Sequence, residues 1–276
     1  MNTILKNLFL IGVLVISGCA SIPDSRTDRF GERRVEYALA GKGAPAVIFE
    51  SGLGGTMDWW AKVFPEVAKE TTVFAYNRPG YGESERAVTA RDGDHVVDEL
   101  RALLKSRNLR PPYVLVGHSL GGLYMQLFAR RYPDEVAALV LVDSTHPEQF
   151  KGAGARENWP AWARVVFGLL LSETAETELN AIGATGVAVL SLPPLEGKPV
   201  FVLSALEPMQ EKSALAIDAN EKRKDIVRLH PGAKQIWVDS GHAIPLEKPG
   251  AVIQAIREAL RESRSGRTPL PAVPVE

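Results

Sequence analysis

One segment restricts the fold more than any other part of the chain. An apolar, strand-like run at 113–116 leads directly into Gly-His-Ser-Leu-Gly-Gly (117–122) and then into a helical stretch that ends near Tyr132. A strand that turns this sharply into a helix brings neighbouring backbone very close, so small residues are needed at Gly117 and Gly121. The segment therefore predicts a buried strand whose end presents Ser119 at the edge of a sheet.

The rest of the chain fits such a sheet. Short runs rich in Val, Ile and Phe alternate with stretches of helical spacing, as at 96–104 and 252–260. This alternation is typical of a mostly parallel sheet flanked by helices, so we predict an α/β fold. The predicted strands are 34–39, 46–50, 72–76, 113–117, 137–143, 200–204 and 235–239.

A long insertion interrupts this alternation of strand and helix patterns between residues 146 and 198. We place it after strand 6 of the sheet, between the two parts of the core, 31–145 and 199–263. It contains Trp159, Trp162 and the apolar run 165–171, and we predict a helical cap over the strand ends, where open α/β sheets bind ligands. Trp159 and Trp162 are expected to line the pocket, or else to pack the cap onto the core.

The two ends of the chain differ from the core in their residue pattern. Residues 1–18 carry Lys6 and an apolar run of nine residues, too short to cross a bilayer, which needs about 20. The run ends in Ile-Ser-Gly-Cys (16–19), which resembles the lipobox of bacterial lipoproteins. That resemblance implies a signal peptide at 1–18, a lipid on Cys19 and a membrane-anchored place in the bacterial cell envelope.

In a Gram-negative host, the same resemblance implies the outer membrane, facing the periplasm. The alternative is an ordinary secretory signal with a chance cysteine. We predict a flexible tether at 19–30 and, from its prolines, a disordered tail at 264–276.

Charge and composition exclude several kinds of function. The 32 Lys and Arg against 33 Asp and Glu give a net charge of −1, too little to attract nucleic acid. No Cys/His cluster has metal-ligand spacing, so we expect neither a metal nor a cofactor. Cys19 is the only cysteine, which excludes an internal disulfide.

Strand, Gly-x-Ser-x-Gly and helix together predict a nucleophile elbow with Ser119 as the nucleophile. A serine hydroxyl needs a positioned base, usually histidine. Among the five histidines, His242 follows the last predicted strand and would reach the same sheet edge, whereas His118 is expected to point away from the site. Backbone donors for an oxyanion are predicted at Leu120 and, in the Gly-rich loop 51–55, at Leu53.

From about residue 33 to 263, the chain resembles the α/β-hydrolase family. The resemblance is carried by Ser-Gly-Leu-Gly-Gly (51–55), Asn-Arg-Pro-Gly-Tyr-Gly-Glu-Ser (77–84), Gly-His-Ser-Leu-Gly-Gly (117–122) and Gly-His (241–242). Ser51 and Asn77 depart from the family's usual His and Asp, and neither change removes a backbone donor or a triad member. The resemblance implies the α/β-hydrolase fold and a triad of serine, acid and histidine.

The acid of the triad has two candidates. Relatives place it either after the strand corresponding to 200–204, where the chain offers Glu207, or at the end of the preceding strand, where it offers Asp143. We favour Asp143.

The resulting hypothesis is a carboxylesterase-like serine hydrolase that cleaves uncharged, small-molecule esters through an acyl-enzyme. The same site would also serve a cofactor-free perhydrolase or a hydrolase of carbon–carbon bonds. An alternative of another class is an inactive lipoprotein that uses the fold to bind a ligand or partner.

Overall fold

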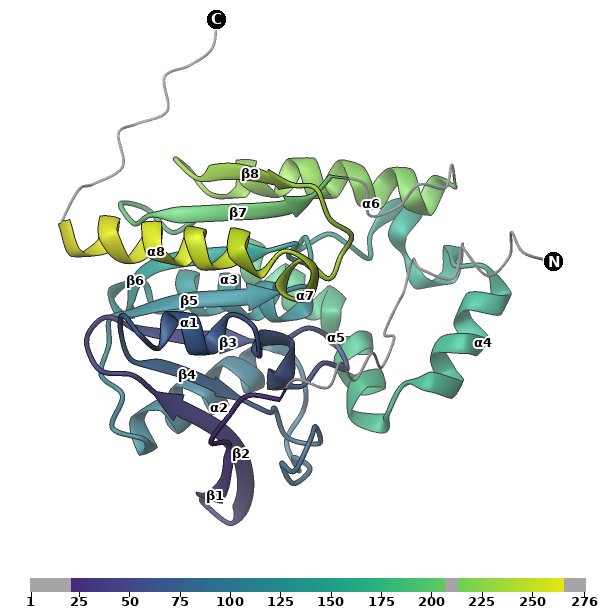
Figure 1. Ribbon diagram of the computed structural model, residues 1–276. Helices are drawn as coiled ribbons and strands as arrows, with labels where there is room; N and C mark the ends of the chain where they lie inside the picture. Colours follow the sequence, from purple (N-terminus) through teal and green to yellow (C-terminus); the bar gives the residue numbers. More distant parts are fainter. Residues whose placement is uncertain (1–20, 207–212, 266–276) are drawn as a thin grey trace, which may run out of the picture.

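The computed structural model describes residues 21–206 and 213–265, apart from the side chains of 162, 163 and 165–167 in the cap. Within these ranges, eight strands form one sheet in the order β1-β2-β4-β3-β5-β6-β7-β8 (Figure 1). All pairs from β4 to β8 are parallel, and the pairs β1·β2 and β2·β4 are antiparallel. The predicted α/β-hydrolase fold, a mostly parallel sheet with a cap after strand 6, is confirmed.

The strands agree with the sequence prediction to within one residue at nearly every end. They are β1 (Arg26–Phe30), β2 (Arg33–Ala40), β3 (Ala46–Glu50), β4 (Val73–Tyr76), β5 (Tyr113–His118), β6 (Val136–Val142), β7 (Val200–Ala205) and β8 (Lys234–Val238).

The central strands are apolar because helices cover both of their faces. Every residue of β3 to β7 is buried, and the side chains alternate between two apolar clusters on opposite faces. Helices α2, α3 and α5 pack on one face, and α1 and α8 on the other (Figure 1). Burial of each large aliphatic side chain stabilises the folded state by roughly 1.5–3 kcal/mol. The central strands are therefore a stable support for the residues that follow their carboxyl ends.

The first six helices lie between strands in chain order, and the last two follow β8. They are α1 (Phe64–Val67), α2 (Gly93–Ser106), α3 (Leu120–Arg131), α4 (Ala161–Leu170), α5 (Glu173–Leu190), α6 (Ala214–Asp225), α7 (Ile244–Glu247) and α8 (Pro249–Ser265), with a 3-10 turn η2 at Met57–Trp60.

The predicted tether at 19–30 is wrong in its second half. Arg26–Phe30 form β1, an antiparallel edge strand on β2, and Ile22 is buried with its N–H donating to Asp58 Oδ1 at 3.0 Å. The polar sequence of β1 concealed it because most of its residues are exposed. Likewise, α8 continues to Ser265, two residues beyond the predicted end of the core. Residues 1–20, with Cys19, and 266–276 lie outside the described part of the chain.

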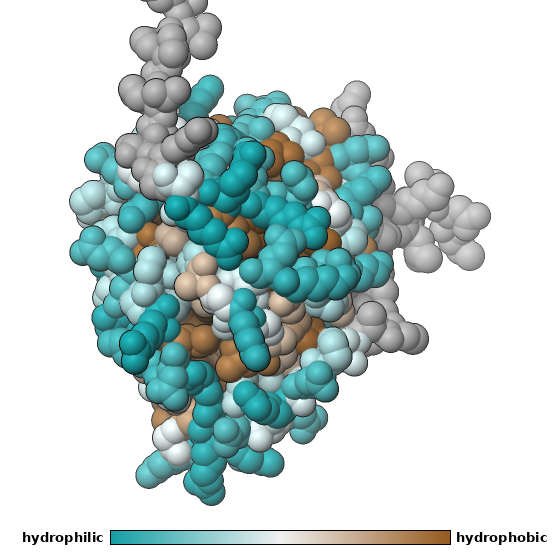
Figure 2. Space-filling model, turned by 60° about the vertical axis from the view of Figure 1, so that its left-hand side comes forward, coloured by the Kyte–Doolittle hydropathy of each residue, from teal (hydrophilic) through white to brown (hydrophobic). Residues whose placement is uncertain are grey.

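The cap lies between β6 and β7 and consists of α4, α5 and short 3-10 turns. Leu169 and Leu170 at the end of α4 are strongly exposed. On the face shown in Figure 2, hydrophilic side chains dominate and only small apolar patches appear between them. None of the helices within residues 21–206 and 213–265 has the length and hydropathy to cross a membrane.

Candidate active site

The turn from β5 into α3 places Ser119 in a strained backbone conformation. Ser119 has φ 54° and ψ −124°, in the positive-φ region that side chains rarely adopt. Its N–H donates to Val142 O at 3.1 Å, and its carbonyl accepts from Thr145 N–H at 3.0 Å. A Cβ at Gly117 would lie 2.6 Å from Gly121 O, so this turn excludes larger residues at 117. The turn therefore presents Ser119 Oγ beyond the end of β5.

His242, on the loop between β8 and α7, joins Ser119 to Asp143. His242 Nε2 lies 3.0 Å from Ser119 Oγ, and His242 Nδ1 lies 2.5 Å from Asp143 Oδ2. Asp143, which follows β6, has a fully buried side chain, whereas that of His242 is 42% exposed. The histidine can therefore be reached from outside, while its carboxylate partner is shielded from water.

A model of the α/β hydrolase fold family matches residues 45–186, just over half of the chain. The chain belongs to this family. The Bacillus subtilis protein YqjL is 32% identical over 103 residues, which cover 37% of this chain and 41% of YqjL. The Bacillus subtilis protein YbdG is 34% identical over 121 residues, so this chain spans only about two fifths of the length of either relative.

Solved structures share the fold of this chain over most of its length. A thermophilic esterase from Thermogutta terrifontis has a TM-score of 0.63 at 24% identity, covering 87% of this chain and 98% of the esterase. A Pseudomonas aeruginosa protein provisionally described as an epoxide hydrolase has a TM-score of 0.65 at 17% identity, covering 88% of this chain and 98% of that one. At these identities the likeness shows the fold alone.

An arginine that the sequence analysis missed holds the buried carboxylate of Asp143. Arg223, on α6, donates from Nε to Asp143 Oδ1 at 2.6 Å and from Nη2 to Asp143 Oδ2 at 3.0 Å. Ala205 N–H also donates to Asp143 Oδ1, at 3.0 Å. Burial alone would raise the pKa of Asp143, but Arg223 and His242 outweigh it and hold that pKa well below its ordinary value of 3.8. Asp143 is therefore a carboxylate at neutral pH.

His118 lies beside His242 rather than away from the site, contrary to the expectation from the sequence. Its ring stacks on Trp59 at 4.9 Å and lies 4.7 Å from the His242 ring, between centroids. Burial, together with the charge of His242, lowers the pKa of His118 to about 3, so the ring is neutral. Because its Nε2 lies 2.9 Å from the His242 carbonyl, that nitrogen carries the hydrogen and donates it. His118 thus holds the backbone of His242 in place.

The two backbone donors predicted for an oxyanion flank Ser119. Leu120 opens α3, where the first N–H groups of a helix have no partner within it. Leu53 lies in the loop after β3, next to Gly52. A Cβ at Gly52 would lie 3.0 Å from Ser119 Cβ, so the loop passes directly against the serine.

Of the two residues predicted to line the pocket, the structure describes the side chain of Trp159. Trp159 is buried at 6% exposure in the apolar cluster below the cap, and its indole N–H donates to Gly154 O at 3.0 Å. It therefore packs the cap onto the core, which is the second of the two roles expected for it, and a role as a pocket wall stays a prediction. The side chain of Trp162 and the whole of Glu207 lie outside the described residues.

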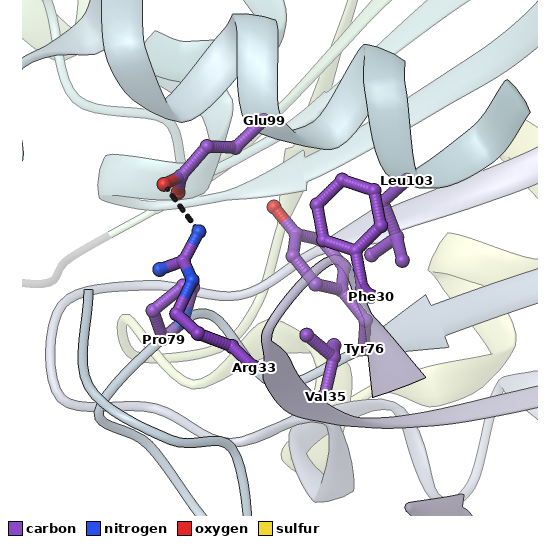
Figure 3. A pocket seen from close by; sticks show the side chains of 7 residues that line it. All are labelled: Phe30, Arg33, Val35, Tyr76, Pro79, Glu99 and Leu103. Carbon is purple, nitrogen blue, oxygen red and sulfur yellow. Dashed lines mark hydrogen bonds and ion pairs between the residues drawn. The ribbon is translucent and has the colours of Figure 1, made fainter. Parts of the chain in front are cut away.

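A small hollow lies on the side of the sheet that carries α2, and none of Ser119, Asp143 or His242 lines it (Figure 3). Arg33 Nη2 donates to Glu99 Oε1 across it at 2.9 Å. Its lining consists of Phe30, Arg33, Val35, Tyr76, Pro79, Glu99 and Leu103. Within the described ranges, no three His, Cys, Asp or Glu side chains gather as they would around a metal ion.

Proposed function

We propose that this chain is a serine hydrolase that cleaves carboxylic esters of uncharged substrates. The observation that carries the proposal is the continuous series from Ser119 Oγ through His242 to Asp143, with separations of 3.0 and 2.5 Å. A serine alone is a weak nucleophile at neutral pH, and this arrangement supplies the base that it needs.

In the proposed reaction, Ser119 Oγ attacks the acyl carbon while His242 Nε2 accepts its proton. Asp143 accepts a hydrogen bond from Nδ1–H, fixes the tautomer and stabilises the imidazolium. The N–H groups of Leu53 and Leu120 bind the oxyanion. His242 then returns the proton to the leaving alcohol, and water repeats the sequence on the acyl-enzyme to release the acid and restore Ser119.

The proposal is tested with a fluorophosphonate probe and a panel of p-nitrophenyl esters of different chain length and charge. We expect labelling and turnover with neutral esters, and Ser119→Ala should abolish both while the circular dichroism spectrum stays unchanged. Labelling of the Ala variant would require another nucleophile, and a preference for charged acyl groups would contradict the substrate class.

Epoxide hydrolysis is the second candidate, because one of the structural neighbours carries that description. Hydrolases of that class resemble this one in fold but use an aspartate as nucleophile, where this chain has Ser119. Turnover of an epoxide without ester turnover would favour it. Perhydrolase and carbon–carbon hydrolase activities would use the same Ser119 site, so only substrate profiling separates them from ester hydrolysis.

We further propose that the protein is anchored in the cell envelope by a lipid on Cys19, as the Ile-Ser-Gly-Cys motif indicates. Cys19→Ser should move the protein from the membrane fraction to the soluble fraction or leave an unprocessed precursor. Metabolic labelling with a fatty acid, followed by fractionation, checks this result. Unchanged labelling and fractionation of the variant would contradict the anchor.

A further inference from the structure

A buried charged cluster lies behind the loop that carries Leu53. Its members are Glu50 at the end of β3, Arg78 after β4 and Glu178 on the cap helix α5, and each side chain is at most 1% exposed. Arg78 pairs with Glu50 Oε1 at 2.6 Å and with Glu178 Oε2 at 2.9 Å. The cluster therefore connects the sheet to the cap directly behind the proposed oxyanion loop.

Arg78 also binds the backbone of that loop. Its Nη1 donates to Ser51 O at 2.6 Å, and its Nη2 donates to Gly52 O at 2.8 Å. The Gly52 carbonyl and the Leu53 N–H belong to one planar peptide unit and point in opposite directions. A guanidinium that holds this carbonyl therefore fixes the direction of the N–H. The same unit lies against Ser119, since a Cβ at Gly52 would be 3.5 Å from Ser119 Oγ.

We propose that Arg78 is the positioning residue of the oxyanion site, and that Glu178 couples this positioning to the cap. This inference rests on the proposed ester hydrolysis at Ser119. Arg78 holds the 52–53 peptide so that Leu53 N–H meets the oxyanion, and α5 is fixed to the same guanidinium. The loop and α5 are therefore held by the same side chain.

Tyr81 strengthens the connection between loop and cap. Its hydroxyl donates to Glu178 Oε2 at 2.8 Å and accepts from Gly54 N–H at 3.3 Å. Glu178 therefore connects to Ser51 and Gly52 through Arg78, and to Gly54 through Tyr81. The guanidinium of Arg91 also approaches Glu178 Oε1, at 3.5 Å, so two cations face the two buried carboxylates.

Stability alone does not explain such a cluster. Burial of an ion pair costs desolvation energy that its attraction often only offsets, so apolar side chains would hold the cap at least as well. The planar fork of arginine, however, can bind two carbonyls and two carboxylates at once, whereas lysine offers a single charged centre. The arrangement thus depends on the shape of Arg78 as well as its charge.

The experiment compares Arg78→Lys and Glu178→Gln with Arg101→Lys, which alters a remote Arg–Glu pair between α2 and Glu135. The readouts are kcat and KM with a p-nitrophenyl ester, and the affinity for a trifluoromethyl ketone, which forms an oxyanion with Ser119. Loss of one oxyanion donor typically costs about 10²–10³ in kcat. For Arg78→Lys we expect a fall of that order, a KM within about threefold, and a parallel loss of ketone affinity.

Glu178→Gln keeps the shape of the side chain and removes its charge, so we expect a fall of about tenfold in kcat by the same argument. Arg101→Lys should leave all three quantities unchanged. A folded Arg78→Lys protein with wild-type kcat and ketone affinity would overturn the inference. If that variant does not fold, wild-type kcat in Glu178→Gln overturns it instead. Absence of ester turnover and probe labelling in the wild-type protein would instead contradict the proposed function itself.

Discussion

Two arginines bind buried carboxylates at the carboxyl ends of the central strands, and they differ in which other groups they bind. Arg223 is 15% exposed and binds two side chains, the carboxylate of Asp143 and, at 3.3 Å, the amide oxygen of Asn220. Asp143 in turn contacts His242. Arg78 is fully buried and binds two backbone carbonyls as well as two carboxylates. The first arginine therefore acts on charge within the proposed triad, and the second acts on the shape of the loop beside it.

The carboxylates that the two arginines bind also respond differently to burial. Burial raises the pKa of Glu50, although Arg78 and Tyr76 oppose the shift. At Asp143, Arg223 and His242 outweigh burial, and the pKa is lowered. An equally buried carboxylate thus gains or loses a preference for its charged form according to the partners around it.

The largest expected effect comes from the acid itself. Asp143→Asn should lower kcat by about 10³–10⁴, because the amide cannot hold the required tautomer of His242. Glu207→Gln should lower kcat by no more than about tenfold if Asp143 is the acid, a limit taken from the same template. Steady-state kinetics with one ester measure both variants. The reverse pattern would make Glu207 the acid of the triad instead of Asp143.

An intermediate effect is expected from Arg223→Met. The variant removes the positive charge that competes with His242 for Asp143, while Ala205 N–H still orients the carboxylate. Arg223 helps to lower the pKa of Asp143, so its removal should raise that pKa and move the acidic limb of the kcat/KM profile to higher pH. We expect a loss of about tenfold or less near neutral pH, since the triad itself stays complete.

Arg223→Lys is the matched control because it keeps the charge, and it should retain most of the wild-type profile. An unchanged acidic limb in Arg223→Met, measured between pH 5 and pH 8, would show that Arg223 has no influence on the charge of the triad. The difference between Arg223, which acts on charge, and Arg78, which acts on the shape of the loop, would then no longer hold.

The smallest effect concerns the pH dependence of stability. The pKa of Asp143 is lowered on folding, so its contribution is present above pH 3.8 and is lost as pH falls below it. The pKa of Glu50 is raised, so its contribution is present below pH 4.5 and is lost as pH rises through its folded-state pKa. Urea unfolding at pH 3 and pH 6 measures how far each variant is destabilised relative to wild type. This destabilisation should change with pH in opposite directions for Asp143→Asn and Glu50→Gln.

For Asp143→Asn, the destabilisation relative to wild type should shrink as pH falls from 6 to 3. For Glu50→Gln, the destabilisation should grow over the same interval. If both variants show the same trend, the partners around these carboxylates do not set the direction of the shift.

The sequence alone predicted most of the sheet, because central strands such as β3 and β5 are apolar on both faces and glycine is required at the turn after β5. It missed β1, whose exposed residues carry no apolar pattern. The position of Asp143 followed from chain order, since adjacent parallel strands end at the same edge.

Other parts of the site could not be predicted. Arg223 lies in the charged second half of α6, at 221–225, and it is 80 residues from the carboxylate that it binds. Arg78 and Glu178 are 100 residues apart, and no local pattern indicates that they pair. His118 was misplaced because the sequence cannot show which ring will pack beside His242. Pairings of this kind are set by tertiary packing rather than by residue spacing.

The place of β8 has a consequence for how the protein loses activity on heating. Among the strands of residues 21–206 and 213–265, β8 is the last of the sheet and pairs only with β7, and four of its five residues are partly or fully exposed. Ser119 and Asp143, by contrast, follow the adjacent central strands β5 and β6. Edge elements with few buried contacts open locally at lower free energy than the core does. His242 should therefore separate from its two partners before the domain melts, so thermal inactivation should precede global unfolding and reverse on cooling.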